Sequence, residues 1–179
     1  EINQFGEDTV GEMAEVIKDF AANKPKAVII DLRNNPGGFL NDVPPIAGHF
    51  IAPSVVVKEK YRNGGTDQLR SNGIPELPDI PLFVLINGGS ASASEILAGA
   101  LQDYKRATLI GEKSFGKGSV QELIDLPGNT ALRVTIAEWL TPLDRAINKI
   151  GIEPEVKVTD EKTEAKDPVL DKALELANK

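Results

Sequence analysis

The sequence of 179 residues contains no cysteine and only one histidine, His49. Disulfide bonds and thiolate metal sites are therefore excluded, and one histidine is too few for a histidine-rich metal site. Aromatic residues make up only 5% of the chain. No apolar run approaches the roughly 20 residues that cross a bilayer. The longest runs are 27–30 and 82–86.

Basic charge is also scarce, because 20 Lys and Arg residues stand against 27 Asp and Glu residues, a net charge of −7. A nucleic-acid-binding domain would need a basic stripe, so this class is disfavoured. The length and the hydrophobic content of 41% are typical of one globular domain with a single core. The start at Glu1-Ile2-Asn3, without an initiator Met, is typical of a fragment of a longer protein.

The order of patterns indicates an α/β layered domain with hairpin additions, because apolar strand-length runs alternate with helical spacing. The runs at 27–30 and 81–87 are apolar throughout, which predicts parallel strands covered on both faces. The other predicted elements are helices at 7–23, 39–51 and 93–104, a strand at 107–111, a hairpin from 54–61 through Asn63-Gly64-Gly65, and a pair of strands 120–126 and 130–137 across Pro127-Gly128-Asn129.

Two local signals concern helix starts. Thr9 and Glu12 have the spacing of a capping box for the first helix. Asp167 before Pro168 predicts the start of a final helix, with Asp as N-cap.

Segment 159–166 has almost no apolar content and indicates a solvated linker. The expected organisation is a core at 1–158, followed at 159–179 by this linker and a helix that packs on the core.

The densest candidate for chemistry is the run of small residues at 88–95, between a predicted buried strand and a predicted helix. Ligands of α/β sheets gather beyond the carboxyl ends of strands. A serine there would lie near the free N–H groups of the helix. The simpler interpretation is that Ser90, Ser92 or Ser94 caps the helix, with Glu95 in its first turn. This stretch alone favours capping.

Two glycine-flanked segments are weaker candidates. Lys117 stands between Gly116 and Gly118, outside any P-loop spacing; the glycines indicate a fixed direction for the lysine, but this segment alone favours a surface lysine in a turn. Segment 34–38 ends in two glycines, which could offer N–H donors to an oxyanion, but this segment alone favours a strand-to-helix turn that needs a positive φ. His49 lies in an apolar stretch, where packing is favoured over catalysis. A base need not be histidine, since a Ser-Lys pair follows the same logic.

Four stretches then stand in order along most of the chain: DLRNNPGG at 31–38, GSASASEILAGALQD at 89–103, GEKSFGKGSVQ at 111–121, and TP at 141–142 with GIEP at 151–154. Together they resemble the carboxyl-terminal processing proteases, or tail-specific proteases, of the S41 serine peptidase family. The third stretch contains that family's F-G-K-G-x-x-Q pattern. The resemblance implies a layered ClpP/crotonase-like α/β core with a mixed sheet and hairpin additions.

The resemblance also assigns roles to residues. It implies Ser92 as the nucleophile and Lys117, 25 positions later, as the general base. Gln121, expected one helical turn beyond the lysine, would orient the amine, and Asp103 would hold the local structure. The flanking glycines would let the loop press Lys117 into an apolar pocket, which favours the neutral amine.

The backbone of Gly38, or Gly37, and that of Ala93 would form the oxyanion hole. The resemblance implies no metal and no cofactor. The substrate would be the C-terminal tail of a protein, bound as an extended strand at a sheet edge. It also implies an extracytoplasmic location in the cell envelope, a PDZ domain of the parent chain as partner, and a possible homo-oligomer.

The chain departs from the family pattern in two ways. The PDZ domain and the helical region that usually precede the core are absent from this chain, and Asp144 stands where the family commonly has glycine. Two other functions stay open. One is a non-catalytic ligand- or peptide-binding module of the same fold, which has no need of Ser92, Lys117 and Gln121 together. The other is a crotonase-like acyl-thioester enzyme, which leaves the F-G-K-G pattern unexplained.

Overall fold

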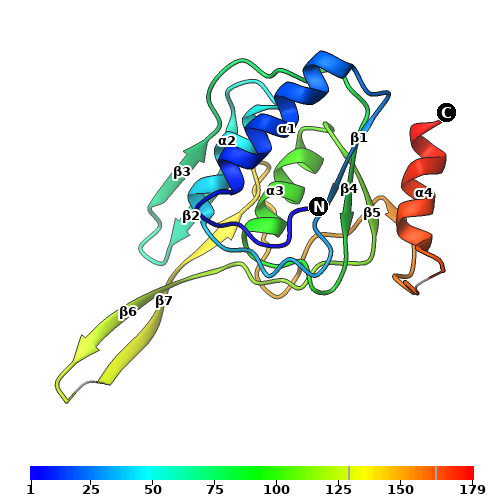
Figure 1. The fold of residues 1–179 in the computed structure, drawn as a ribbon. Helices are drawn as coiled ribbons and strands as arrows, with labels where there is room; N and C mark the ends of the chain where they lie inside the picture. Colours follow the sequence, from blue (N-terminus) through cyan, green and yellow to red (C-terminus); the bar gives the residue numbers. More distant parts are fainter. Residues whose placement is uncertain (129, 164) are drawn as a thin grey trace.

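The computed structural model describes residues 1–128, 130–163 and 165–179. Its elements are, in chain order, α1 (Thr9–Asn23), β1 (Val28–Asp31), the 3-10 helix η1 (Leu40–Asp42), α2 (Val43–Gly48), β2 (Val55–Tyr61), β3 (Thr66–Arg70), β4 (Leu82–Ile86), α3 (Ala93–Asp103), β5 (Thr108–Gly111), β6 (Ser119–Leu126), β7 (Thr130–Leu140), β8 (Val156–Lys157) and α4 (Pro168–Ala177). A parallel sheet has the strand order β1-β4-β5-β8, and an antiparallel sheet has the order β3-β2-β7-β6 (Figure 1). The predicted α/β class is confirmed, with parallel and antiparallel pairing separated into two sheets.

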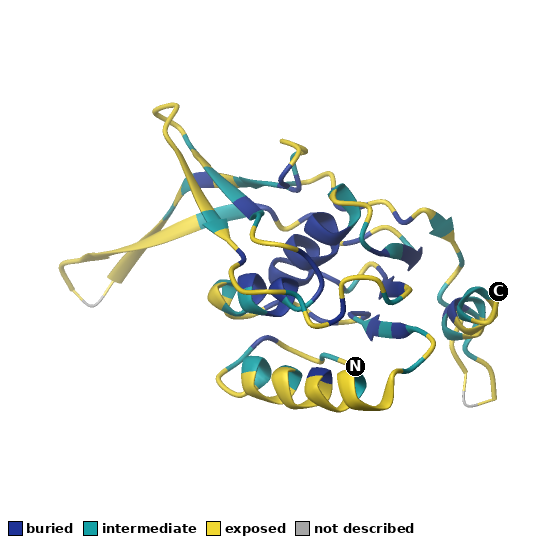
Figure 2. Cartoon of the chain, turned by 90° about the horizontal axis from the view of Figure 1, so that it is seen from above, coloured by how far each residue is buried: buried dark blue, intermediate teal, exposed yellow. Residues whose placement is uncertain are grey.

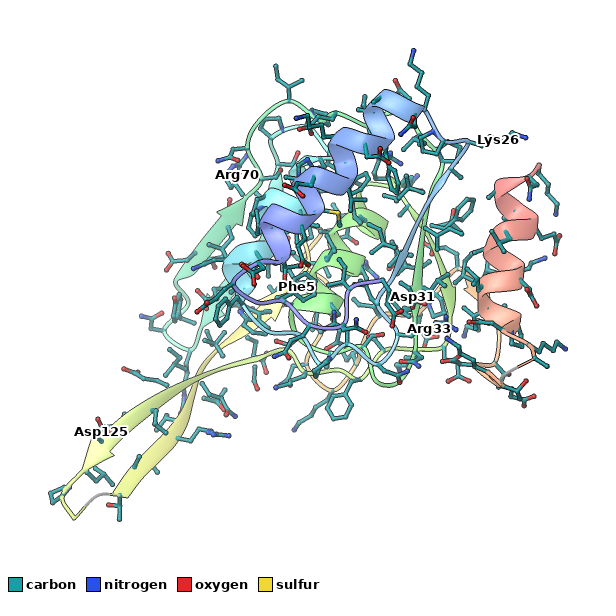
Figure 3. All side chains as sticks on the ribbon, in the orientation of Figure 1. Phe5, Lys26, Asp31, Arg33, Arg70 and Asp125 are labelled. Atoms are coloured by element: carbon teal, nitrogen blue, oxygen red, sulfur yellow. The ribbon has the colours of Figure 1, made fainter. Side chains whose placement is uncertain are left out.

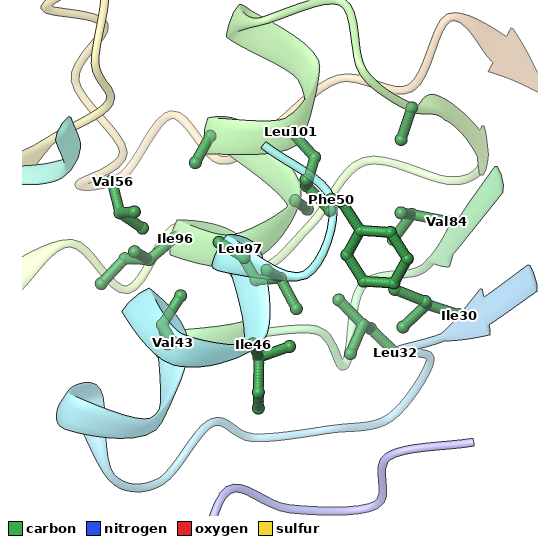
Figure 4. Close-up of a cluster of buried hydrophobic side chains, with 14 of the residues drawn as sticks. Ile30, Leu32, Val43, Ile46, Phe50, Val56, Val84, Ile96, Leu97 and Leu101 are labelled. Carbon is green, nitrogen blue, oxygen red and sulfur yellow. The ribbon is translucent and has the colours of Figure 1, made fainter. Parts of the chain in front are cut away.

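The parallel sheet is covered on both faces, as its apolar runs predict. All five residues of β4 are buried. Leu82, Val84 and Ile86 pack in the large cluster shared with α2 and α3, part of which Figure 4 shows. Phe83 and Leu85, which point to the opposite face, pack against α4. β4 is therefore the centre of a layered core.

Helix α3 is buried on all sides over residues 93–101. Small side chains at most of these positions let side chains of neighbouring segments come close to the helix. At Gly99, for example, an added Cβ would lie 2.9 Å from the methyl group of Thr141. A helix so enclosed holds its N-terminus in a fixed place, and this N-terminus carries the serine-rich turn.

Two hairpins extend the antiparallel sheet. The turn Asn63-Gly64-Gly65 joins β2 and β3, as predicted. The predicted pairing of 120–126 with 130–137 is also confirmed, and the β6–β7 ribbon projects from the body with most residues exposed (Figure 2). Asn129 of its predicted turn lies outside the described residues.

Two expectations about helices are wrong. The N-cap of α1 is Asp8, and Thr9 Oγ1 instead accepts a hydrogen bond from the N–H of Gly6, at 2.9 Å, so no capping box forms. The expected helix at 39–51 is a 3-10 turn followed by the six residues of α2. Pro44 and Pro45 have no N–H to donate, which limits the helix that this segment can form.

The C-terminal segment contacts the core more closely than its composition indicates. α4 begins as predicted, with the Asp167 carboxylate accepting from the N–H of Leu170 at 3.0 Å. Asp160, in the expected solvated linker, is only 11% exposed and pairs with Arg33. The linker expectation is thus wrong at Asp160, while Glu164 lies outside the described residues. None of the helices in the described ranges is long and apolar enough to span a membrane.

Candidate active site

Ser92 lies in the turn that leads from β4 into α3, and its backbone has φ 57° and ψ −117°. Few residues other than glycine adopt this conformation, which costs on the order of 1–3 kcal/mol. Such strain is concentrated at functional sites, and a sharp strand-to-helix turn carries the nucleophilic serine of many hydrolases; Ser92 itself is 8% exposed. The conformation of Ser92 therefore marks it among the serines of this turn.

The two neighbouring serines hold the turn in place. Ser90 Oγ donates to the carbonyl of Leu32 at 2.8 Å, and Ser94 Oγ donates to the carbonyl of Asn35 at 3.1 Å. Both serines are fully buried. They attach the Ser92 turn to the loop that follows β1.

The Glu95 carboxylate, which is fully buried, accepts four hydrogen bonds. Its Oε2 accepts from the N–H groups of Ser92 and Lys117, at 2.9 and 2.8 Å. Its Oε1 accepts from Ser114 Oγ and the N–H of Gly116, both at 2.6 Å. Four donors satisfy a charge that would otherwise be costly to bury. Glu95 therefore joins the Ser92 turn to the Lys117 loop.

Ser92 is the N-cap residue of α3, and Glu95 accepts from its N–H, so the N-cap position predicted for this turn is compatible with a catalytic serine. The linking role of Glu95 was missed by the sequence reasoning, which placed this residue only in a favourable first turn. A signal was present, because the rest of 93–101 contains only small or apolar side chains. A single carboxylate within a helix buried on all sides has to be paired.

The side chain of Lys117 is exposed, so the expectation of an apolar pocket around it is wrong for this structure. In this loop it is the backbone on either side of Lys117, and not the lysine side chain, that packs against the rest of the protein. An added Cβ at Gly118 would lie 2.3 Å from the backbone nitrogen of Asn148, and one at Gly116 would lie 3.2 Å from that of Gly151. The flanking glycines thus serve close backbone packing.

Gln121 is exposed on β6, in a strand rather than a helix, so its spacing from Lys117 is not a helical turn. The pairing of β6 with β7 shifts its register between Val120 and Gln121. A bulge of this kind redirects a side chain and is frequent beside active sites. The extra residue of this pairing, Ile136, lies on β7, opposite the part of β6 that carries Gln121.

The glycine loop after β1 lies against Ser92. A Cβ added at Gly37, which has φ 98°, would lie 2.7 Å from Ser92 Cβ and 3.0 Å from the nitrogen of Ala93. The N–H of Gly37 donates to Asn35 Oδ1 at 2.8 Å. Within the described part of the chain, the N–H groups of Gly38 and Ala93 make no hydrogen bond. These two groups are the donors still available to a ligand.

Three other residues lie outside this cluster. Asp103, at the far end of α3, accepts from Arg145 Nε at 2.7 Å, which agrees with a structural role. His49 Nδ1 lies 2.9 Å from a carboxylate oxygen of Glu76. Asp144 has φ 63°, a conformation that glycine adopts without strain, which agrees with the expectation of glycine at this position.

Comparisons with known proteins agree with the resemblance. The model of the family described as peptidase family S41 matches residues 1–158. A carboxy-terminal-processing protease of Bartonella bacilliformis is 44% identical over 160 residues, and a carboxyl-terminal-processing protease of Synechocystis is 43% identical over 154 residues. These alignments cover 87% and 86% of this chain, but only 37% and 36% of the relatives.

Among solved structures, a photosystem II D1 C-terminal processing protease superposes with a TM-score of 0.85 at 34% identity. The match covers 89% of this chain and 42% of that protein. The chain therefore spans less than half the length of each of these three relatives.

Proposed function

The chain belongs to peptidase family S41, and from this membership we propose that it is the catalytic core of a serine endopeptidase that cleaves proteins near their C-termini. The observation that supports the proposal most directly is the strained backbone of Ser92. The names of the relatives concern C-terminal processing, and this supports protein tails as the substrate class.

In the proposed reaction, Ser92 Oγ attacks the scissile carbonyl carbon while its proton passes to Nζ of Lys117. The oxyanion then accepts hydrogen bonds from Gly38 and Ala93, and one such donor is typically worth ~10²–10³ in rate. Protonated Lys117 returns the proton to the leaving amine, which departs and leaves an acyl-enzyme. Lys117 then takes a proton from water as the water attacks the ester carbonyl, and returns this proton to Ser92 Oγ as the acyl–oxygen bond breaks and the carboxylic acid product is released. The scheme uses no metal and no cofactor.

Lys117 has to lose its solvent shell before it can act as a base, because water favours the charged amine. A peptide that lies across the Ser92 turn would cover the exposed lysine and exclude water from it. Gln121 would then hold the amine without adding a charge that favours its protonated form. In this proposal, substrate binding completes the dyad.

The substrate would bind as an extended strand. β6 is an edge strand of the antiparallel sheet, begins two residues after Lys117 and carries Gln121. Pairing of the tail with this edge would provide affinity through the main chain and selectivity through alternate side chains. The family resemblance further supports delivery of the tail by a PDZ domain of the parent chain, a possible homo-oligomer, and a location outside the cytoplasm in the cell envelope.

The proposal is tested by cleavage of unstructured protein tails that differ only in their last few residues, with and without an added PDZ domain. The wild-type chain should cleave them, whereas Ser92→Ala and Lys117→Ala should not. Lys117→Arg should also be inactive, because arginine stays protonated. Full activity of Lys117→Ala would contradict the mechanism.

One observation favours the alternative of a non-catalytic binding module, namely the exposed side chain of Lys117. A binding module does not require this side chain to become shielded from water, whereas the protease mechanism does. A serine-reactive fluorophosphonate distinguishes the two functions. A protease of this mechanism is labelled at Ser92. A binding module, or a crotonase-like enzyme, binds its ligand without labelling there.

A further inference from the structure

Arg33 connects the end of β1 to the C-terminal segment. Its side chain is only 5% exposed, and it directly precedes the glycine loop at 34–38. Nη2 donates to Asp31 at 2.6 Å and to Asp167 at 2.8 Å, while Nη1 donates to Asp160 at 3.0 Å. Figure 3 shows Asp31 and Arg33 beside the start of α4. The guanidinium thus has carboxylate partners from both parts of the chain.

Asn87 follows β4 as Arg33 follows β1, and it lies in the loop that leads to Ser92. Its Oδ1 accepts from the N–H groups of Asn34 and Gly89, both at 2.9 Å. Since both backbone groups can only donate, the orientation of the amide is fixed. Nδ2 must therefore face Asp160 Oδ2, at 2.7 Å.

The carboxylate of Asp160 accepts hydrogen bonds from the loop after β1 and from the loop after β4. Oδ1 binds Arg33 and Oδ2 binds Asn87. The N–H of Asp160 donates to Glu112 Oε1 at 3.2 Å, just after β5, so the backbone of this residue is also held. The carboxylate bridges the carboxyl ends of β1 and β4 from outside the sheet.

We propose that Asp160 is a positioning residue that keeps the Gly37–Gly38 loop in place against the turn of Ser92. This inference rests on the proposed function, in which these two loops carry an oxyanion donor and the nucleophile. A displacement of about 1 Å between such groups can cost ~10²-fold in rate. Asp160 lies beyond residues 1–158, the part that the family model matches.

The test uses Asp160→Asn in the whole chain. The amide has the shape of the carboxylate but only one acceptor oxygen, and both of its partners are donors. One of the two links is therefore lost, and an N–H group faces another donor. We expect labelling of Ser92 by a fluorophosphonate to slow at least tenfold, with the KM for a cleaved tail near the wild-type value. Glu161→Gln, an exposed neighbour with the same charge change, should label at the wild-type rate.

A second variant separates positioning from stability. Val169→Ala removes a buried side chain from α4 without touching Asp160. At a temperature where every variant is folded, Val169→Ala should label like wild type even if its Tm falls further than that of Asp160→Asn. If labelling slows equally in both variants, or does not slow in Asp160→Asn, the positioning role of Asp160 is overturned while the proposed function stands. A wild-type chain that is not labelled at Ser92 would overturn the proposed function as well.

Discussion

The backbone N–H groups of Ser92 and Lys117 donate to the same oxygen atom, Oε2 of Glu95, at 2.9 and 2.8 Å. Because the acceptor is shared, the distance between the two backbone nitrogens cannot exceed the sum of these two hydrogen-bond lengths. The residues proposed as nucleophile and base are thus brought together through their backbones. This arrangement makes Glu95 the residue on which the geometry of the site depends most.

Glu95→Gln should therefore impair both stability and reactivity. Glutamine offers one acceptor oxygen to four converging donors, and the donors left opposite its NH₂ group are buried and unsatisfied. Each such donor costs about 1–3 kcal/mol, so we expect the free energy of unfolding to fall by at least about 2 kcal/mol. Urea unfolding measures this loss. Labelling of Ser92 should slow in the same variant under conditions where it stays folded.

Asp103→Asn is the matched variant for this prediction. Asp103 is also buried, with its side chain 2% exposed, and accepts from Arg145 and from the N–H of Leu143. It lies at the opposite end of α3 from Ser92. Its substitution should lower stability and leave the labelling rate unchanged. A loss of labelling as large as that in Glu95→Gln would show that instability alone explains both results.

Gly37→Ala should damage the site directly. The new Cβ would lie 2.7 Å from Ser92 Cβ and 2.8 Å from the carbonyl oxygen of Ala91, in a backbone with φ 98°. Backbone and packed side chains cannot yield at these distances, so we expect labelling of Ser92 to drop by at least tenfold. Mass spectrometry of the labelled peptide provides the measurement.

Gly64→Ala is the control that separates the steric clash expected in Gly37→Ala from the strain of placing alanine at a positive φ. Gly64 has φ 89°, similar to Gly37, but a Cβ there meets nothing within 4 Å. The cost of the left-handed conformation, about 1–2 kcal/mol, should appear as lower stability with normal labelling. If both variants label equally, contact between Gly37 and Ser92 does not shape the site.

The docking of α4 should depend on pH in a defined range. Hydrogen bonds from Arg33 lower the pKa of Asp167 from 3.8 to about 2. Because the pKa is depressed in the folded state, the stability that this carboxylate contributes is present above about pH 4. It is lost as the pH falls toward 2. The difference in unfolding free energy between wild type and Asp167→Asn should shrink over this range. A difference that vanishes already at pH 5, or that is undiminished at pH 2, would contradict this assignment.

Much of the fold could be predicted from local patterns. The strands at β1 and β4 are uninterrupted apolar runs, and α3 follows a serine-rich turn, so element type and order were both encoded locally. The same locality explains the errors. Thr9 had the spacing of a capping box, yet its hydroxyl binds Gly6, which no spacing rule anticipates.

Long-range contacts account for what sequence reasoning missed at the site. Asp160 stands in a polar segment, and only the folded chain reveals that Arg33 and Asn87 meet it. Glu95 is likewise defined by donors about twenty positions away. The exposure of Lys117 reflects packing of its glycine neighbours against segment 147–151, which the loop sequence does not specify.

The central claim is that Ser92 is the nucleophile and that Lys117 activates it. The most direct test is the second-order rate constant for reaction of the chain with a fluorophosphonate, with the modified residue mapped by mass spectrometry. We predict modification at Ser92 alone in the wild-type chain, and a rate at least ~10²-fold lower in both Lys117→Ala and Lys117→Arg. Modification at another residue, or an undiminished rate at Ser92 in Lys117→Ala, would contradict the claim.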